Sequence, residues 1–222
     1  MKMYTIYYGT NNAAKVNYLK NIVKILPFEI IGIYELHNID HKINESGKEP
    51  LENAKIKALY YYDQIKKPVF SIDSGLFFEN VEYKDQPGIH VRRVNGKKLN
   101  DDEMIEYYSK LSEKYGGGII GYYKNAMYVK INDEINIEKD DGKINSEKFI
   151  LASKAHQKRI EGWPLDSLSK EIKSGKYYYD INRIWDNKEV EEEYTKIFNE
   201  IMEKMKALKE STTPPWRAKL DP

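Results

Sequence analysis

Strand-like and helix-like spacings of apolar residues alternate along the first part of the chain. Residues 3–9, "MYTIYYG", are rich in β-branched and aromatic side chains and end at a glycine, which predicts a buried strand. Residues 15–26 carry valine, leucine and isoleucine at helical spacing, and residues 28–36 return to a strand-like composition. The chain therefore begins as strand, helix and strand.

A second helix and a third strand follow. Residues 49–65 place two alanines and a tyrosine along one helical face, and Pro50 suits the first turn of a helix. Residues 68–72, "PVFSI", are a short apolar run, so we expect a strand that ends at Asp73. Strands that alternate with helices in this way favour the α/β fold class.

The second half of the chain is richer in strands. Residues 101–111 predict a helix whose acidic start complements the helix dipole. Residues 116–132 and 147–157 predict two long strands, which we expect to be joined through a hairpin near residues 141–142.

The C-terminal part of the chain divides into a helix and a tail. Residues 190–210 carry an apolar stripe that is typical of an amphipathic helix. The last residues contain two adjacent prolines and show little periodicity. We therefore expect one domain over residues 1–209 and a flexible tail over residues 210–222.

The composition narrows the class of protein. The chain has 222 residues, of which 41% are hydrophobic and 32% charged, as in a globular protein with a sizeable core. Lysine and arginine number 36 against 35 acidic residues, so the charge gives no sign of a nucleic-acid polymer as a partner. The absence of cysteine excludes disulfides, thiolate catalysis and cysteine-based zinc sites.

The hydropathy pattern bears on location. No run of about 18 apolar residues occurs in the sequence, so we expect no membrane span and no membrane partner. Residues 1–9 lack the long apolar core and cleavage site of a signal peptide. A cytoplasmic protein is the expectation.

The first stretch whose residues suit ligand binding joins the first strand to the first helix. A strand that ends at Gly9 and Thr10 and continues into a helix presents free backbone amides, which bind phosphate readily. Asn12 adds a short polar side chain and Lys15 adds a cation. The stretch does not match a Walker loop. An ordinary helix N-cap is the alternative interpretation.

The second and third stretches supply carboxylates. Glu52 and Lys57 lie on the predicted helix of residues 49–65, where Glu52 suits either a helix-dipole partner or a ligand of a hard divalent cation. Asp73 follows an apolar strand, at the kind of strand end where α/β folds place ligands. The run Asp73-Ser74-Gly75 also suits a simple turn.

Together these stretches resemble the signature of the inosine triphosphate pyrophosphatase family, also called the Ham1-like family. The matching motifs are Thr10-x-Asn12-x-x-Lys15, Glu52-Asn53-Ala54-x-x-Lys57-Ala58 and Asp73-Ser74-Gly75-Leu76. The segment "PGIHVRR", residues 87–93, is similar to the one that follows in the family. The resemblance covers roughly residues 3–120 and is specific because both order and spacing agree.

The resemblance implies a Mg²⁺-dependent hydrolase that cleaves purine nucleoside triphosphates to the monophosphate and pyrophosphate. Members prefer deaminated purines such as inosine and xanthosine triphosphates, cleanse the nucleotide pool and work as homodimers. The resemblance also implies an elongated α/β fold, in which helices flank a mixed, curved central sheet and two lobes surround a cleft.

The resemblance further implies roles for single residues. Lys15 and Lys57 would bind the triphosphate, and Asp73 would orient and deprotonate the attacking water. The implied catalytic residues are Asp73, Lys15 and Glu52, the implied metal ligands are Glu52 and Asp73, and the implied substrate-binding residues are Thr10, Asn11, Asn12, Lys15, Lys57, Ser74, Gly75, Arg93, Trp163 and Asp166. Such a set suits phosphoryl-type transfer, which depends mostly on positioning and on neutralising charge.

Two departures from the family pattern leave an alternative open. The family usually has two adjacent aspartates before Ser-Gly, and Ile72 replaces the first of them. The stretch "GWPLDSLS", residues 162–169, resembles only loosely the family's loop that recognises the base, and no Ser-His-Arg motif precedes the C-terminal helix. The alternatives are a nucleotide-binding protein with weak or lost catalysis and, further off, a purely structural α/β scaffold.

Overall fold

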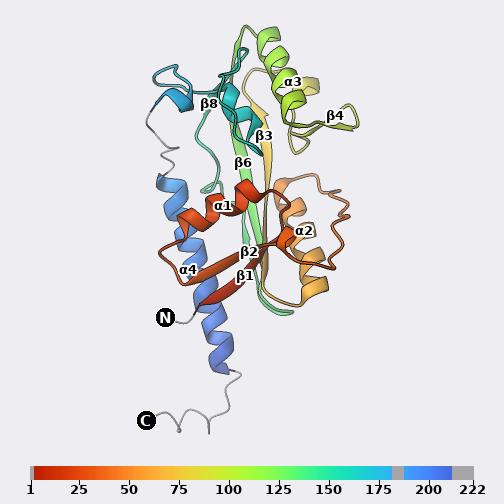
Figure 1. Cartoon of the computed structure of the whole chain (residues 1–222), viewed down its shortest axis with the longest axis vertical. Coiled ribbons are helices and arrows are strands. Elements are labelled where there is room, and N and C mark those ends of the chain that lie inside the picture. The colour runs from red at the N-terminus through yellow and green to blue at the C-terminus, as the bar shows by residue number, and fades with distance from the viewer. Residues whose placement is uncertain (1–2, 182–187, 212–222) are drawn as a thin grey trace.

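A long pair of antiparallel strands forms the spine of an elongated molecule (Figure 1). The computed structural model describes residues 3–181 and 188–211. The two spine strands are β3 (Val69–Phe78) and β6 (Gly118–Lys130), which pair over the whole length of β3. They link a lower lobe, which contains both chain termini of the described ranges, to an upper lobe (Figure 1).

The sheet is mixed, as the family resemblance implies. Its seven strands have the order β2-β1-β3-β6-β8-β9, with β7 also paired to β6. The strand β1 runs parallel to both β2 and β3, and the other pairs are antiparallel. The remaining sheet strands are β1 (Tyr4–Tyr8), β2 (Phe28–Gly32), β7 (Asn136–Lys139), β8 (Phe149–Ala152) and β9 (Ser169–Glu171).

Helices cover both faces of this sheet, and shorter elements complete the lobes. The α-helices are α1 (Ala13–Ile22), α2 (Pro50–Ile65), α3 (Asp101–Lys114) and α4 (Lys188–Ser211). A separate hairpin joins β4 (Arg93–Val94) to β5 (Lys97–Lys98). Short 3₁₀ helices are η1 (Ile33–Glu35), η2 (Tyr83–Asp85), η3 (Pro164–Leu168) and η4 (Tyr178–Asp180).

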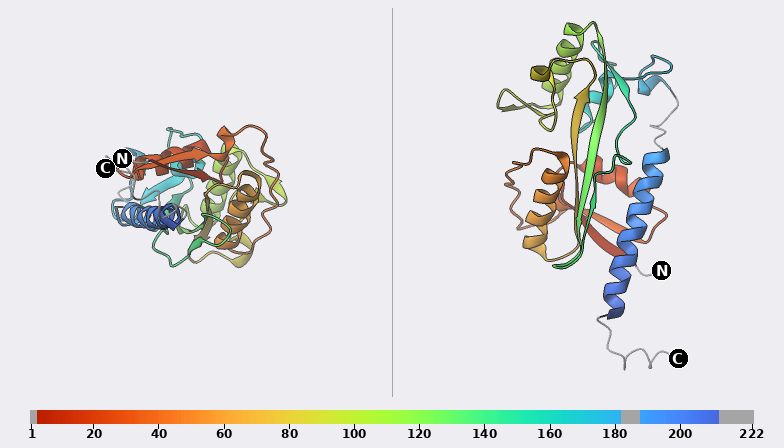
Figure 2. Two further views of the ribbon diagram at one scale, coloured as in Figure 1. Left: turned by 90° about the horizontal axis from the view of Figure 1, so that it is seen from below. Right: turned by 180° about the vertical axis from the view of Figure 1, so that it is seen from behind.

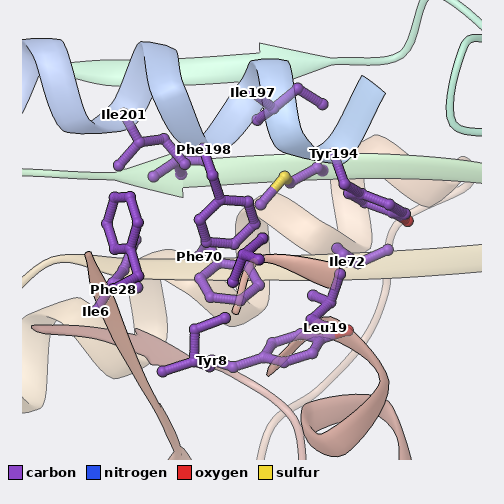
Figure 3. Close-up of a cluster of buried hydrophobic side chains, with 14 of the residues drawn as sticks. Ile6, Tyr8, Leu19, Phe28, Phe70, Ile72, Tyr194, Ile197, Phe198 and Ile201 are labelled. Atoms are coloured by element: carbon purple, nitrogen blue, oxygen red, sulfur yellow. The ribbon is translucent and has the colours of Figure 1, made fainter. Parts of the chain in front are cut away.

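The lower lobe is a three-layer arrangement, in which α4 and α2 lie on opposite sides of the spine (Figure 2). Successive residues of a strand point to opposite faces. Accordingly, Phe70 and Ile72 of β3 join Leu19 of α1 and Phe198 of α4 in one core cluster (Figure 3). Val69, on the other face, packs in the cluster of α2. Because both faces are buried, the strands read as nearly continuous apolar runs.

The upper lobe has its own core. Leu76 and Phe78, at the far end of β3, pack with Tyr108 of α3, Phe149 of β8 and Leu165 of η3. The spine therefore contributes to both cores, and its middle lies between them. Nothing in the described ranges shows a cleft at that point, so the cleft between the lobes stays a prediction.

The structure corrects the predicted end of the third strand. We expected β3 to end at Asp73, but it continues to Phe78. Asp73, Ser74 and Gly75 therefore form neither a strand end nor a turn. The reason is that β6 provides hydrogen-bonding partners along the whole of this segment, which a single-strand pattern cannot reveal.

Other boundaries also differ. The strand predicted over residues 28–36 ends at Gly32 and passes into η1, and the strand predicted over residues 147–157 shortens to β8. The turn at residues 141–142 connects β7 to β8, because the unpredicted strand β7 first returns along β6.

The helix α4 runs to Ser211, and residues 212–222 of the predicted tail lie outside the described residues. None of the helices in the described ranges combines the length and apolar character that a membrane span requires.

Candidate active site

The loop between β1 and α1 is held in a fixed conformation. Asn12 is the N-cap of α1, and its Oδ1 accepts a hydrogen bond of 2.9 Å from the Ala14 amide. Thr10 Oγ1 accepts from the Asn12 amide at 3.2 Å, and the Gly9 carbonyl accepts from Ser71 Oγ at 2.7 Å. The N-cap is therefore confirmed, and it places the amides of the α1 N-terminus beside β3.

Lys15, in the first turn of α1, is partly buried. Burial, together with the positive charge of Lys57, lowers the pKa of Lys15 to about 8, against the opposing carboxylates of Asp73 and Glu45. Three of the predicted site residues thus lie within electrostatic reach of one another. Two ammonium groups held near each other repel, and an added phosphate would relieve that repulsion.

Asp73 and Lys57 form an ion pair. The Lys57 ammonium donates to Asp73 Oδ1, and only 12% and 14% of the two side chains are exposed. Asp73 lies opposite Ala126 in the middle of the spine and faces α2, whereas Ile72 faces the core of α1 and α4. Ile72 therefore does not point toward the carboxylate of Asp73.

Glu52 organises the loop that precedes α2. Its Oε2 accepts from the Lys48 amide at 2.7 Å, and the neighbouring buried Asn53 accepts from the Gly47 amide at 2.9 Å. Glu52 also occupies the first turn of α2, where a carboxylate complements the helix dipole. The residues of the Glu-Asn-Ala motif thus have a structural role that does not exclude metal binding.

The metal ligands stay a prediction. Within the described residues, no group of three or more histidine or acidic side chains is arranged to hold a metal ion. A Mg²⁺ ion usually takes one or two carboxylates and completes its shell with phosphate oxygens and water. The carboxylates of Glu52 and Asp73 therefore have the right chemistry for Mg²⁺, and no preformed all-protein cage surrounds them in the described residues.

The Pro-Gly segment lies antiparallel to β3 and forms a β-bridge between Gly88 and Leu76. The Leu76 amide donates to the Gly88 carbonyl at 2.8 Å, and a Cβ at Gly75 would lie 3.2 Å from that carbonyl oxygen. Ser74 lies beside Gly75, opposite Asn125 of β6. This close approach of two backbone segments explains why glycine follows Ser74.

Arg92, rather than the predicted Arg93, has contacts near the site. Arg93 lies exposed on β4. Arg92 donates to Asp101 Oδ1 at 2.7 Å and to the Leu99 carbonyl at 3.4 Å, and its charge helps to lower the pKa of Lys15. The sequence offers no signal that would choose between two adjacent arginines.

The loop at residues 160–163 lies against the N-terminal part of α1. Asn12 Nδ2 donates to the Gly162 carbonyl at 3.2 Å, and the Trp163 ring meets the edge of Tyr18 at 6.3 Å between ring centres. Asp166 follows in η3, and burial raises the pKa of its carboxyl to about 7. Trp163 thus lies beside α1, and Asp166 follows it along the chain in η3.

Comparison with known proteins identifies relatives. A model of the Ham1 family matches residues 6–127. A dITP/XTP pyrophosphatase from Caldanaerobacter subterraneus subsp. tengcongensis is 34% identical over 171 residues, which is 76% of this chain and 75% of the relative. A dITP/XTP pyrophosphatase from Borrelia recurrentis is 33% identical over 141 residues, which is 60% of this chain and 67% of the relative.

Solved structures share the fold. A HAM1 protein from Coxiella burnetii has a TM-score of 0.68 at 20% identity, covering 89% of this chain and 100% of its own. The Ham1 protein of Staphylococcus aureus has a TM-score of 0.62 at 21% identity, covering 91% and 100%. From the match over residues 6–127 and the identity to these curated relatives, the chain belongs to the Ham1 family.

Proposed function

We propose that this protein is a nucleoside triphosphate pyrophosphatase that hydrolyses deaminated purine nucleoside triphosphates, ribo or deoxy, to the monophosphate and pyrophosphate. Its relatives carry the name dITP/XTP pyrophosphatase. The observation that carries the proposal is the convergence of Lys15, Lys57 and Asp73, from three separate elements, at the middle of the spine. The physiological role would be to cleanse the nucleotide pool.

The triphosphate would bind at the N-terminus of α1. The loop of Thr10, Asn11 and Asn12 leads into the positive end of the helix dipole, and the Asn12 amide would leave Thr10 Oγ1 to donate to a phosphate oxygen. Lys15 and Lys57 would neutralise the phosphate charge, and Ser74 and Gly75 would line the same region of β3. We keep Arg93 as a predicted contact from the neighbouring hairpin.

A divalent metal ion would complete the site, and we propose Mg²⁺. Glu52 and Asp73 would provide its protein ligands, and substrate oxygens and water the others. When bound, such an ion neutralises charge on the phosphates and polarises the bond that breaks. Glu52 can reach a metal only by giving up its hydrogen bond to the Lys48 amide or by using its second oxygen.

Asp73 would act on the attacking water. In the structure Lys57 occupies Asp73 Oδ1. We propose that the triphosphate draws the Lys57 ammonium toward a phosphate oxygen, so that the Asp73 carboxylate becomes available to accept a proton from water. The rigid position of Asp73 within the spine would hold that water in line with the phosphorus atom under attack.

Trp163 and Asp166 would contact the purine. Their loop lies beside the N-terminus of α1, on the upper-lobe side of the phosphate region. Trp163 offers a large apolar surface for a base, and a buried carboxylate such as Asp166 can accept a hydrogen bond from the N1–H group that deaminated purines carry.

The competing interpretation, a nucleotide-binding protein with lost catalysis, is not favoured, because the relatives are named as enzymes and the set Lys15, Glu52, Lys57 and Asp73 is complete. A homodimer and a cytoplasmic location stay predictions.

A pyrophosphate-release assay with Mg²⁺ tests the proposal. Inosine, xanthosine, adenosine and guanosine triphosphates and their deoxy forms would be compared at equal concentrations. We expect release of pyrophosphate, fastest with the inosine and xanthosine compounds. Release of orthophosphate in place of pyrophosphate, or no release from any of them, would contradict it.

A further inference from the structure

A chain of hydrogen bonds connects the two lobes at the candidate active site. Asn12 Nδ2 donates to the Gly162 carbonyl at 3.2 Å, the Gly162 amide donates to Asp101 Oδ2 at 3.0 Å, and Arg92 donates to Asp101 Oδ1 at 2.7 Å. Asn12 caps a helix of the lower lobe, whereas Asp101 begins α3 in the upper lobe. We call these four residues the latch.

Each residue of the latch has a second contact that fixes it. Asn12 Oδ1 accepts from the Ala14 amide, so one side-chain amide both caps the helix that carries Lys15 and holds the loop at Gly162. Asp101 is only about one-third exposed (35%), and both of its oxygens are used. Despite burial, which alone would raise it, the pKa of Asp101 lies below its usual value, because Arg92 and the Gly162 amide stabilise the carboxylate.

The backbone at Gly162 is shaped for this contact. Its φ of +80° lies in the left-handed region, and a Cβ there would come within 2.8 Å of Asn12 Oδ1. Glycine therefore lets the loop come close enough to accept the hydrogen bond from Asn12. The carbonyl of Gly162 accepts from Asn12 of the lower lobe, and the amide of Gly162 donates to Asp101 of the upper lobe.

We propose that the latch is a positioning device that sets the separation between the phosphate-binding end of α1 and the loop of Trp163 and Asp166. This inference rests on the proposed function, since it takes the triphosphate to lie at α1 and the base to lie at that loop. Asp101 and Arg92 would touch neither substrate nor metal. They would act by holding Gly162, and through it the loop, at the distance that a nucleoside triphosphate spans.

The latch makes a distinctive prediction about ligands of different length. Inorganic triphosphate fills only the phosphate region, so its affinity should not depend on where the loop lies. Inosine triphosphate must reach both regions, and a loop that is not held in place must be ordered when the nucleotide binds. Breaking the latch should therefore weaken the nucleotide and spare the inorganic triphosphate.

Asp101→Asn breaks the latch with little change of shape. One carboxylate oxygen becomes an amide nitrogen, which cannot accept, so the side chain can accept from Arg92 or from Gly162 but not from both. Losing a charge-assisted hydrogen bond at a partly exposed position should weaken binding by about tenfold. We expect the Kd for the α,β-methylene analogue of inosine triphosphate, which the proposed reaction cannot cleave during calorimetry with Mg²⁺, to rise by about that factor and the Kd for inorganic triphosphate to change less than about twofold.

Asp102→Asn is the matched control. Asp102 is the exposed neighbour in the same first turn of α3, so this variant also removes one charge from the helix N-terminus. It should leave both affinities unchanged. Gly162→Ala breaks the latch from the other side and should also raise the Kd for the nucleotide. Because its Cβ would press on Asn12 in the phosphate loop, it should weaken inorganic triphosphate as well, but to a smaller extent.

Three outcomes would overturn the proposal. The first is that both ligands bind equally more weakly to folded Asp101→Asn. The second is that the Kd for the nucleotide does not rise in either latch variant. The third is that Asp102→Asn raises the Kd for the nucleotide as much as Asp101→Asn does. In steady state the effect should appear in KM rather than kcat, because the loop contact is equal in the ground and transition states. A wild-type protein that binds the nucleotide but releases no pyrophosphate would defeat the proposed function and leave this binding comparison intact.

Discussion

Lys57 and Asp73 form a largely buried ion pair that joins the second turn of α2 to the middle of the β3 strand. Neither residue is at the end of its element, so both are held rigidly. The pair places an anion and a cation side by side at the point where Lys15 adds a second cation. A triphosphate with a divalent metal offers a partner of opposite charge to each of them.

The ion pair itself predicts a stability effect. Lys57→Met leaves the Asp73 carboxylate unpaired in a site where 14% of its side chain is exposed, which should lower the free energy of unfolding by about 3 kcal/mol. Lys57→Met combined with Asp73→Asn removes both charges and should recover most of that loss. Urea unfolding of the single and double variants measures the coupling. A double variant no more stable than Lys57→Met would show that the pair contributes little.

Lys15 predicts a pH dependence of substrate binding. Its pKa of about 8 means that the ammonium loses its proton as the pH rises through that value in the free protein. A bound triphosphate favours the ammonium and raises this pKa, so binding takes up a proton above pH 8 and the affinity falls with rising pH. The phosphates do not interfere, because their last pKa is near 6.

Calorimetry of the α,β-methylene analogue of adenosine triphosphate between pH 7 and pH 9.5, in buffers of different ionisation enthalpy, measures both affinity and proton uptake. This ligand is not cleaved at the bridge, and its base has no proton that titrates in this range. Lys15→Arg is the control, since arginine stays charged throughout and should flatten the profile. Lys15→Ala should raise KM at every pH in this range. A wild-type affinity that is constant from pH 7 to pH 9.5 would remove Lys15 from the phosphate site.

The metal prediction rests on Glu52. Activity should disappear in EDTA and return with Mg²⁺, and Glu52→Gln should need more Mg²⁺ for half-maximal rate, because an amide oxygen is a weaker ligand than a carboxylate. Glu49→Gln is the matched control, since Glu49 lies one turn earlier and pairs with Lys124. Full activity in EDTA, or an equal Mg²⁺ shift in both variants, would contradict the assignment of Glu52.

Base selection should be modest and should depend on Asp166. Because the Ser-His-Arg motif is missing, few hydrogen-bonding groups would be left unpaired when a wrong base binds. The ratio of kcat/KM for inosine triphosphate to kcat/KM for adenosine triphosphate should therefore stay below about 10⁴. Burial raises the pKa of Asp166 to about 7, so the carboxylate, which accepts from N1–H, is present mainly above that pH. The preference for inosine triphosphate should therefore be larger at pH 8 than at pH 6.

Asp166→Asn should abolish this pH dependence, because its amide does not titrate. The comparison uses kcat/KM for the two nucleotides at both pH values in wild type and variant. A ratio well above 10⁴, or a pH dependence that survives in Asp166→Asn, would show that other residues read the base.

The sequence predicted much of the lower lobe because its signals are local. A strand that ends at Gly9, an N-cap at Asn12 and a proline at position 50 each act within one turn of the chain. These signals placed Lys15 and Lys57 on their helices correctly. The convergence of Lys15, Lys57 and Asp73 was suggested by the spacing of the motifs and by the family resemblance.

What the sequence did not predict depends on contacts between distant segments. Asp73 was expected at a strand end, because only the pairing with β6 extends β3 to Phe78. The roles of Arg92 and Asp101 depend on Gly162, which lies about 60 residues further along the chain than Asp101. Such contacts have no local pattern, so a single sequence cannot indicate them.

The catalytic role of Asp73 is the central claim, and Asp73→Asn tests it most directly. The change keeps the size of the side chain but removes its charge and most of its basicity. The measurement is pyrophosphate release from inosine triphosphate with Mg²⁺, together with calorimetric binding of the same nucleotide. We predict a folded variant that still binds the nucleotide while kcat falls by roughly 10²-fold or more, the scale of general-base catalysis. Equal pyrophosphate release by the folded wild type and Asp73→Asn would contradict the account.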